Sequence, residues 1–191
     1  MSSAEDDELT TRASHVQLLI LDVDGVLTDG GLYYTAAGEE LKRFHVQDGL
    51  GIRLLVEHDI KVAVITARRS SALERRMNDL GIADHFYPGQ PDKVAAYQQL
   101  LARVELTDDQ VAYVGDDLLD LPVMRRVLLP ISVADGHALV KEEARYVTSA
   151  RGGQGAVRET ADLLLSSRGD LRTLCDRFLA RHMHKGVLET A

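Results

Sequence analysis

The sequence predicts an α/β protein built on a doubly wound, Rossmann-like parallel sheet. Short aliphatic runs at 18–21, 60–65 and 111–114 have the composition of strands that are buried on both faces of such a sheet. Stretches with helical spacing of apolar residues separate these runs. This alternation of strands and helices is typical of a parallel sheet that carries helices on both faces.

The composition fits one globular domain. The chain has 191 residues, 45% of them hydrophobic and 27% charged, so it can bury a sizeable core. A formal net charge of -8 argues against nucleic acid as a partner, because no basic stripe offsets the acidity. The single cysteine, Cys175, excludes an intramolecular disulfide and fits a reducing compartment.

The two ends of the chain differ from the predicted core at 15–168. Residues 1–14 are polar and acidic, and we expect them to form a disordered tail. No apolar run is long enough to span a bilayer, so we expect a cytoplasmic protein without a membrane partner. Residues 169–191 are expected to form a helical extension with an amphipathic stripe for packing or assembly. The stripe consists of Leu171, Leu174, Phe178 and Leu179.

A projecting β-hairpin is expected at about 29–46, where two β-prone runs flank a turn that contains glycine. Tyr33 and Tyr34 on this ribbon need covering, and a subunit interface is one way to cover them. A polar helix follows at 70–80, with glycine placed to end it. Pro91 suits the first turn of the next helix.

Polar residues follow each of the three aliphatic runs, at the sheet edge where ligands bind in open α/β folds. Asp22 and Asp24 repel each other, so a structure that holds them together supplies a cation or a shared proton. A capping or turn pair is the alternative interpretation. The full set at strand ends and at one helix start is Asp22, Asp24, Thr66, Lys93, Asp116 and Asp117.

In this order, the run DVDGVLTDG, Thr66, Lys93 and the run GDDLLD resemble the four motifs of the haloacid-dehalogenase-like phosphohydrolases. The resemblance covers roughly 16–165. It implies a phosphatase in which Asp22 is the nucleophile and forms an aspartyl-phosphate. Asp24 would protonate the leaving oxygen and then deprotonate the hydrolytic water.

The resemblance also implies a magnesium site and a phosphate site. Asp22, the backbone carbonyl of Asp24 and Asp116 would bind Mg²⁺, which prefers oxygen ligands. Thr66 and Lys93 would bind the phosphoryl oxygens and offset their charge. Relatives that only pass the phosphoryl group on have Thr in place of Asp24, so a phosphatase is favoured.

The spacing of the motifs leaves no room for a cap domain. Thr66 follows Asp24 by 42 positions, and Lys93 follows Thr66 by 27. Capless members of the family cover the site with a neighbouring subunit, so the resemblance implies a homo-oligomer, with a tetramer expected.

Three further runs, GEELKRFHVQDGLGIR, GDDLLDLPVM and GGQGAVRE, are similar to a capless branch that acts on sugar acid phosphates. From the residues alone, a solvated helix face is favoured for Arg53 and for Arg76, and His45 could equally be an ordinary strand histidine. The GGQG run is either a loop before a helix or, by resemblance, part of a segment that closes over a neighbour's site. The substrate contacts that the resemblance implies are Asp24, His45, Val46, Gln47, Asp48, Gly49, Arg53, Arg68, Arg76 and Lys93.

The expected function is therefore Mg²⁺-dependent hydrolysis of the phosphate ester of an eight-carbon 2-keto-3-deoxy sugar acid, an octulosonate of lipopolysaccharide synthesis. Two alternatives stay open. The first is a phosphatase for a nine-carbon sugar acid phosphate or for small phosphates in general. The second is an assembly module, like the phosphatase-like domains attached to acylneuraminate cytidylyltransferases.

Overall fold

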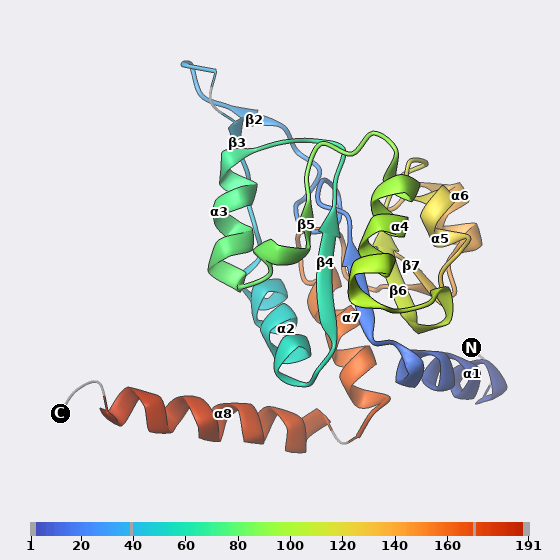
Figure 1. The fold of residues 1–191 in the computed structure, drawn as a ribbon, viewed down its shortest axis with the longest axis vertical. Helices are drawn as coiled ribbons and strands as arrows, with labels where there is room; N and C mark the ends of the chain where they lie inside the picture. Colours follow the sequence, from blue (N-terminus) through green and yellow to red (C-terminus); the bar gives the residue numbers. More distant parts are fainter. Residues whose placement is uncertain (1–2, 39, 170, 189–191) are drawn as a thin grey trace.

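The computed structural model describes residues 3–38, 40–169 and 171–188 and confirms the α/β fold. The main sheet is parallel throughout and has the strand order β5-β4-β1-β6-β7-β8 (Figure 1). Strand β1 pairs with β4 on one side and with β6 on the other, so it ends in the middle of the sheet. The strand bounds are β1 Leu18–Leu21, β4 Lys61–Ile65, β5 Phe86–Tyr87, β6 Val111–Gly115, β7 Leu129–Ser132 and β8 Tyr146–Val147.

Helices pack on both faces of this sheet. Along β1, Leu19 and Leu21 join the core cluster that includes α2, α3 and α7. Leu18 and Ile20 join the cluster on the other face, with α4, α5 and α6, as the two-residue repeat of a strand requires. The helix bounds are α1 Ser3–His15, α2 Val46–Glu57, α3 Ser71–Leu80, α4 Lys93–Val104, α5 Leu121–Met124, α6 Ala138–Glu143, α7 Ala156–Ser166 and α8 Leu171–Leu188, with short 3-10 turns at Ala83–His85 and Asp108–Gln110.

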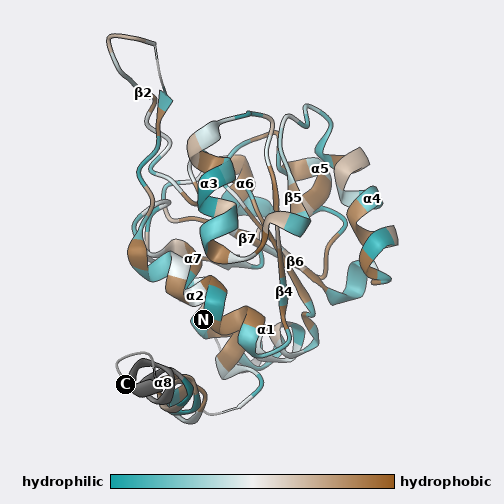
Figure 2. Ribbon diagram, turned by 60° about the vertical axis from the view of Figure 1, so that its left-hand side comes forward, coloured by the Kyte–Doolittle hydropathy of each residue, from teal (hydrophilic) through white to brown (hydrophobic). Residues whose placement is uncertain are grey.

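The predicted hairpin is present and projects from one end of the sheet (Figures 1 and 2). Its strands are β2 (Tyr33–Tyr34) and β3 (Glu40–Leu41), which pair antiparallel. Among the described residues, the segment from β1 to β4 contains only this hairpin and α2 besides loops, so no cap domain is inserted there. Four apolar side chains of the hairpin are 45% to 59% exposed. We call Leu32, Tyr33, Tyr34 and Leu41 the hairpin patch.

The expectation of a disordered tail at 1–14 was wrong for the residues that the structure describes. Residues from Ser3 onward form α1, and the Ala13 side chain is fully buried in the core. Leu9 packs against the same cluster, and Arg12 donates a hydrogen bond to the Leu128 carbonyl at 3.1 Å. Among the described side chains of α1, Leu9 and Ala13 make this apolar contact, and polar residues surround them in the sequence, so the composition alone does not indicate it.

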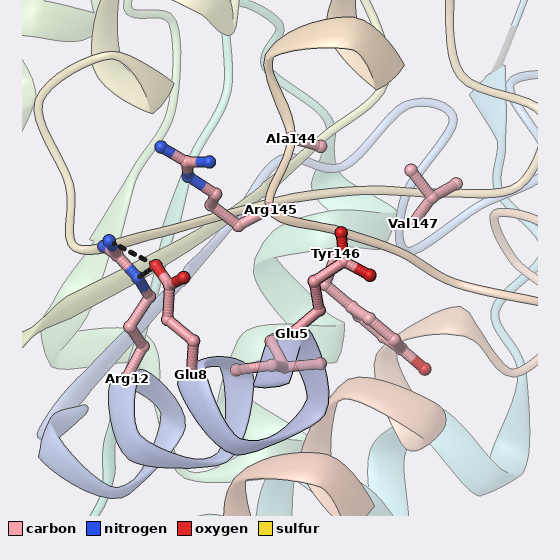
Figure 3. Close-up of a pocket in the computed structure, with 8 residues that line it drawn as sticks. Glu5, Glu8, Arg12, Ala144, Arg145, Tyr146 and Val147 are labelled. Carbon is pink, nitrogen blue, oxygen red and sulfur yellow. Dashed lines mark hydrogen bonds and ion pairs between the residues drawn. The ribbon is translucent and has the colours of Figure 1, made fainter. Parts of the chain in front are cut away.

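Helix α1 lies beside the edge of the sheet at β8 and leaves a cavity there of about 390 Å³ (Figure 3). The cavity lies at β8, two strands away from β6 in the sheet order. Its lining residues are Glu5, Glu8, Leu9, Arg12, Ala144, Arg145, Tyr146 and Val147.

The C-terminal segment forms the long helix α8, which contacts α7 and α2. Leu171, Leu174, Cys175 and Phe178 are partly buried against the core, whereas Leu179 is 54% exposed. The predicted stripe therefore packs on its own chain over most of its described length. Within the described part of the chain, no helix combines the length and the apolar character needed to cross a bilayer.

The burial of Ala13 gives a test of the role of α1. The Ala13→Asp variant should lower the free energy of unfolding by roughly 2–4 kcal/mol, because it places an unpaired carboxylate in the core. Urea unfolding measures this loss. The matched control is Thr11→Asp on the exposed side of the same helix, which should change stability by less than about 0.5 kcal/mol. Equal effects of the two substitutions would contradict docking of α1 on the core.

Candidate active site

The ends of two central strands and one helix start bring four charged side chains together. Asp22 directly follows β1, and Asp116 directly follows β6. Lys93 is the first residue of α4, and its ammonium group lies 2.8 Å from Asp22 Oδ1 and 2.7 Å from Asp120 Oδ1. Carboxylate oxygens of Asp22, Asp116 and Asp120 all lie within 4.8 Å of one another. The parallel sheet thus gathers the predicted residues at one edge, together with Asp120.

Asp120 is 1% exposed and holds Lys93 in place. Besides Lys93, its Oδ1 accepts a hydrogen bond from the Tyr113 hydroxyl at 2.7 Å. Its Oδ2 accepts from the backbone N–H groups of Asp116 and Asp117 at 3.0 and 3.2 Å. These four bonds occupy both oxygens of Asp120. It therefore positions Lys93 and the backbone of Asp116 and Asp117, and it is the poorest candidate of the three aspartates for a metal ligand.

Asp117 has a different position. Its side chain is exposed, and its Oδ1 accepts a bond from the backbone N–H of the next residue, Leu118, at 2.7 Å. The carboxylate therefore shapes the local turn, and its backbone amide is what reaches Asp120.

The carboxylates of Asp22 and Asp116 lack enough positive partners. Burial, with the nearby charge of Asp120, raises the pKa of Asp22 to about 6, although Lys93 opposes the shift. Burial and the charges of Asp22 and Asp120 raise the pKa of Asp116 to about 8. Asp116 Oδ1 is buried and has no hydrogen-bond partner among the described residues. These hard oxygen donors fit a divalent cation such as Mg²⁺, which would relieve their repulsion.

Gly25 makes the close approach to Asp116 possible. Its backbone has a φ of +94°, in the left-handed region that glycine adopts at little cost. A Cβ atom at this position would lie 2.1 Å from Asp116 Oδ2. The glycine of the DVDG run is therefore required by both the turn and the second carboxylate.

Asp24 faces the hairpin side of the site. Its Oδ1 accepts a hydrogen bond from the Lys42 ammonium group, and Arg68 Nε lies 3.8 Å from its Oδ2. Glu40 contacts both cations, at 3.0 Å from Lys42 and 3.5 Å from Arg68. Arg68 also donates to the Tyr34 hydroxyl at 3.4 Å. The structure thus brings the predicted residues Asp24 and Arg68 together, and it adds Lys42, which our sequence analysis did not single out.

Thr66 directly follows β4 and is almost fully buried. Its backbone N–H donates to the carbonyl of Tyr87 at 3.1 Å, and its carbonyl accepts from Gln90 at 2.9 Å. The Arg68 backbone N–H donates to Thr66 Oγ1 at 3.3 Å, which leaves the hydroxyl hydrogen for a ligand oxygen.

The other predicted substrate contacts cluster on α2 and α3, and no described contact joins them to the aspartates. Arg53 donates to the Asp79 carbonyl near the end of α3 at 3.1 Å. Arg76 lies over the Phe44 ring, 5.6 Å from its centroid, and against Gly49. Their role toward a substrate stays a prediction.

The predicted contacts before and at the start of α2 include both exposed and buried side chains. Val46 and Gln47 are exposed, and the Nδ1 atom of His45 is buried without a partner among the described residues. Asp48 is 1% exposed, and its Oδ1 accepts a hydrogen bond from the Arg158 backbone N–H of α7 at 2.8 Å. In this chain Asp48 therefore fastens α2 to the start of α7.

The GGQG run packs against the loop that follows Asp22. Gly153 N–H donates to the Val26 carbonyl at 2.9 Å, and Gly152 N–H donates to Asp135 Oδ1 at 2.9 Å. A Cβ at Gly152 would lie 1.7 Å from the Gly25 carbonyl oxygen. These two glycines therefore pack on the loop after Asp22 in their own chain.

This close contact predicts a functional defect. The Gly152→Ala variant must displace the loop around Gly25, and a displacement of about 1 Å at a reacting group costs roughly 10²-fold in rate. Hydrolysis of 4-nitrophenyl phosphate measures the loss. Gln154→Ala is the control, because its side chain is exposed in the same run and should retain activity within about threefold. Retained activity in Gly152→Ala would show that the loop does not depend on this contact.

The comparisons with known proteins agree with this geometry. A family model described as haloacid dehalogenase-like hydrolase matches residues 84–158. The 3-deoxy-D-manno-octulosonate 8-phosphate phosphatase KdsC of Yersinia pestis is 53% identical over 165 residues, which are 86% of this chain and 88% of that protein. KdsC of Escherichia coli K12 is 50% identical over 164 residues, 86% and 87% of the two chains.

A solved structure extends the likeness to a ligand complex. The 3-deoxy-D-manno-octulosonate 8-phosphate phosphatase of Moraxella catarrhalis, in complex with magnesium ion, phosphate ion and KDO, superposes with a TM-score of 0.86. It is 38% identical, and the match covers 90% of this chain and 98% of that one. With its family motifs gathered at the carboxyl edge of the sheet, this chain belongs to the 3-deoxy-D-manno-octulosonate 8-phosphate phosphatase family of haloacid dehalogenase-like hydrolases.

Proposed function

We propose that this protein hydrolyses 3-deoxy-D-manno-octulosonate 8-phosphate to the free sugar acid and inorganic phosphate, as a step in lipopolysaccharide precursor synthesis. One observation carries the chemistry. The carboxylate of Asp22 stands at the end of the central strand, 2.8 Å from the buried Lys93 ammonium group. A carboxylate held in this way can attack phosphorus, while the cation offsets the charge of the phosphoryl oxygens.

The reaction takes two steps on these residues. An oxygen of Asp22 forms a bond to phosphorus, and the bond between phosphorus and the sugar oxygen breaks. Asp24 gives its proton to that sugar oxygen, which leaves as a hydroxyl group. Asp24, now ionised, takes a proton from water, whose oxygen attacks the phosphorus of the aspartyl-phosphate. The bond to Asp22 breaks, phosphate leaves, and both carboxyl groups return to their starting states.

Three further side chains support the transferred group. Lys93 is fixed by Asp120 and lies beside Asp22, so its charge faces the incoming phosphate. The Thr66 hydroxyl would donate to a phosphoryl oxygen. Asp22, Asp116 and the backbone carbonyl of Asp24 would hold Mg²⁺, which supplies positive charge to the phosphoryl oxygens when bound.

We propose that the sugar acid is recognised on the hairpin side of the site. Arg68 is the best placed of the predicted contacts, because it already approaches the Asp24 carboxylate at 3.8 Å. A guanidinium group can bind the carboxylate of the substrate with two hydrogen bonds. Residues 45–49, Arg53 and Arg76 would complete this surface.

The hairpin patch supports an oligomeric enzyme. Its four exposed apolar side chains form a surface that a second copy of the chain would cover. We propose a homo-oligomer, a tetramer by its family, that works in the cytoplasm.

A substrate panel tests the proposed function. Phosphate release is measured on the eight-carbon and nine-carbon sugar acid phosphates and on hexose phosphates, with Mg²⁺ and with chelator. We expect a clear preference for the eight-carbon substrate and loss of turnover with chelator. Asp22→Asn should lower turnover by roughly 10⁴- to 10⁶-fold, because it removes the nucleophile.

The control for that variant is Asp59→Asn, the same chemical change at an exposed position. Its backbone has a φ of 61°, which asparagine tolerates. It should leave turnover unchanged. Preference for the nine-carbon substrate would replace the proposed substrate, and turnover by Asp22→Asn near that of the native protein would exclude the covalent mechanism.

The raised pKa values of Asp22 and Asp116 predict a pH-dependent response to metal. In the metal-free protein these carboxyls contribute stability at low pH, which is lost as the pH rises through about 6 and about 8. Mg²⁺ binds the ionised carboxylates and competes with the protons. The rise in melting temperature caused by Mg²⁺ should therefore be larger at pH 8 than at pH 6.

Differential scanning fluorimetry measures this response at fixed ionic strength. The Asp116→Asn variant is the control and should show little response to Mg²⁺ at either pH. An equal rise at pH 6 and pH 8 in the native protein would contradict a link between these carboxyls and the metal.

A further inference from the structure

Lys42 lies on the hairpin, but its side chain is buried against Asp24 and Glu40. It directly follows β3, and its neighbours Leu41 and Arg43 are 55% and 60% exposed. The Lys42 side chain is only 2% exposed. A lysine is seldom buried unless it is paired, so its partners explain its position. Those partners are Asp24, through a direct hydrogen bond, and Glu40 at 3.0 Å.

The two cations near Asp24 differ in how firmly they hold it. Lys42 is buried and makes a direct bond to Oδ1. The Arg68 side chain is 42% exposed and stays 3.8 Å from Oδ2. Glu40 bridges the two cations, so Asp24, Lys42, Glu40 and Arg68 form a closed ring of contacts. Lys42 is therefore the firmest anchor of Asp24 in the ring.

We propose that Lys42 is a positioning residue that fixes the carboxyl group of Asp24 for proton transfer at the leaving-group oxygen, with Glu40 holding Lys42 in turn. The inference rests on the acid–base role of Asp24 in the proposed function. An aspartate side chain turns about two bonds, and proton transfer needs its oxygen within about 2.6–3.2 Å of the target. The bond from Lys42 restricts that rotation.

The proposal predicts a dependence on the leaving group. An alkoxide leaves slowly unless it is protonated, whereas 4-nitrophenolate leaves without a proton. The value of kcat/KM covers the steps up to departure of the leaving group. In Lys42→Met it should fall by about 10²-fold on glycerol 3-phosphate and by less than about threefold on 4-nitrophenyl phosphate. Both substrates lack a carboxylate, so recognition of the sugar acid does not enter the comparison.

A second readout follows from the later step. Asp24 must also activate water, so the aspartyl-phosphate should accumulate in Lys42→Met when the leaving group departs easily. With 4-nitrophenyl phosphate we expect a burst of about one nitrophenolate per active site, followed by slower turnover. A defect that only weakened the fold would lower the amount of active enzyme and give neither the burst nor the dependence on the leaving group.

Three variants control the experiment. Lys42→Arg keeps the cation and should recover most of the activity on glycerol 3-phosphate. Arg43→Met removes a neighbouring cation whose contact is Asp29 at 3.5 Å, and it should show no dependence on the leaving group. Asp24→Asn should lose more kcat/KM on glycerol 3-phosphate than on 4-nitrophenyl phosphate, and this bias should be at least as large as in Lys42→Met. Thermal unfolding and oligomeric state are compared for all variants.

The outcomes separate the inference from the function on which it rests. Equal losses of Lys42→Met on both substrates, while Asp24→Asn shows the bias, would overturn the role of Lys42 alone. Absence of the bias in Asp24→Asn would overturn the acid–base role of Asp24, and the inference with it. Failure of Lys42→Arg to recover activity would also overturn positioning by the cation.

Discussion

The buried bridge from Asp22 through Lys93 to Asp120 organises the rest of the site. The Lys93 ammonium group is 2.8 Å from one carboxylate and 2.7 Å from the other, and all three residues are at most 8% exposed. Charges are costly to bury unless each has close partners. Here the Tyr113 hydroxyl and two backbone amides complete the set around Asp120. Strand β1 can place Asp22 at this point because β4 and β6 flank it in the sheet.

The same bridge explains why the site fits a divalent metal ion. One lysine faces three clustered carboxylates, and Asp120 uses its oxygens on Lys93, Tyr113 and backbone amides. Asp22 and Asp116 therefore keep uncompensated negative charge in a buried place, which raises the pKa of both. A bound divalent cation removes that repulsion and adds the charge that phosphoryl transfer needs. The repulsion between Asp22 and Asp116 and their fit to a divalent cation thus have one origin.

Local sequence features predicted the parts of the site that depend on strand direction. Asp22, Thr66 and Asp116 each end an aliphatic run, and parallel strands carry such ends to one edge. Helix α1 was missed because its apolar contact consists of small or isolated side chains. Partners that meet only in the folded chain, such as Lys42 with Asp24 or Asp48 with α7, leave no periodic signal. The positions of Lys42 and Asp48 depend on contacts with residues that are distant in the sequence, and these contacts bury their polar groups.

The hairpin carries both an exposed apolar surface and a lysine that contacts the active site. Its two strands expose the apolar hairpin patch, and the same stretch carries Lys42, which bonds to the carboxylate of Asp24, and Glu40, which contacts Lys42. A partner that covers the patch would also restrict the backbone that carries Lys42. Because this ribbon is short and projects from the core, its position depends on what packs against it (Figure 2). Covering the patch would then also hold the Asp24 carboxylate more firmly, through its bond to Lys42.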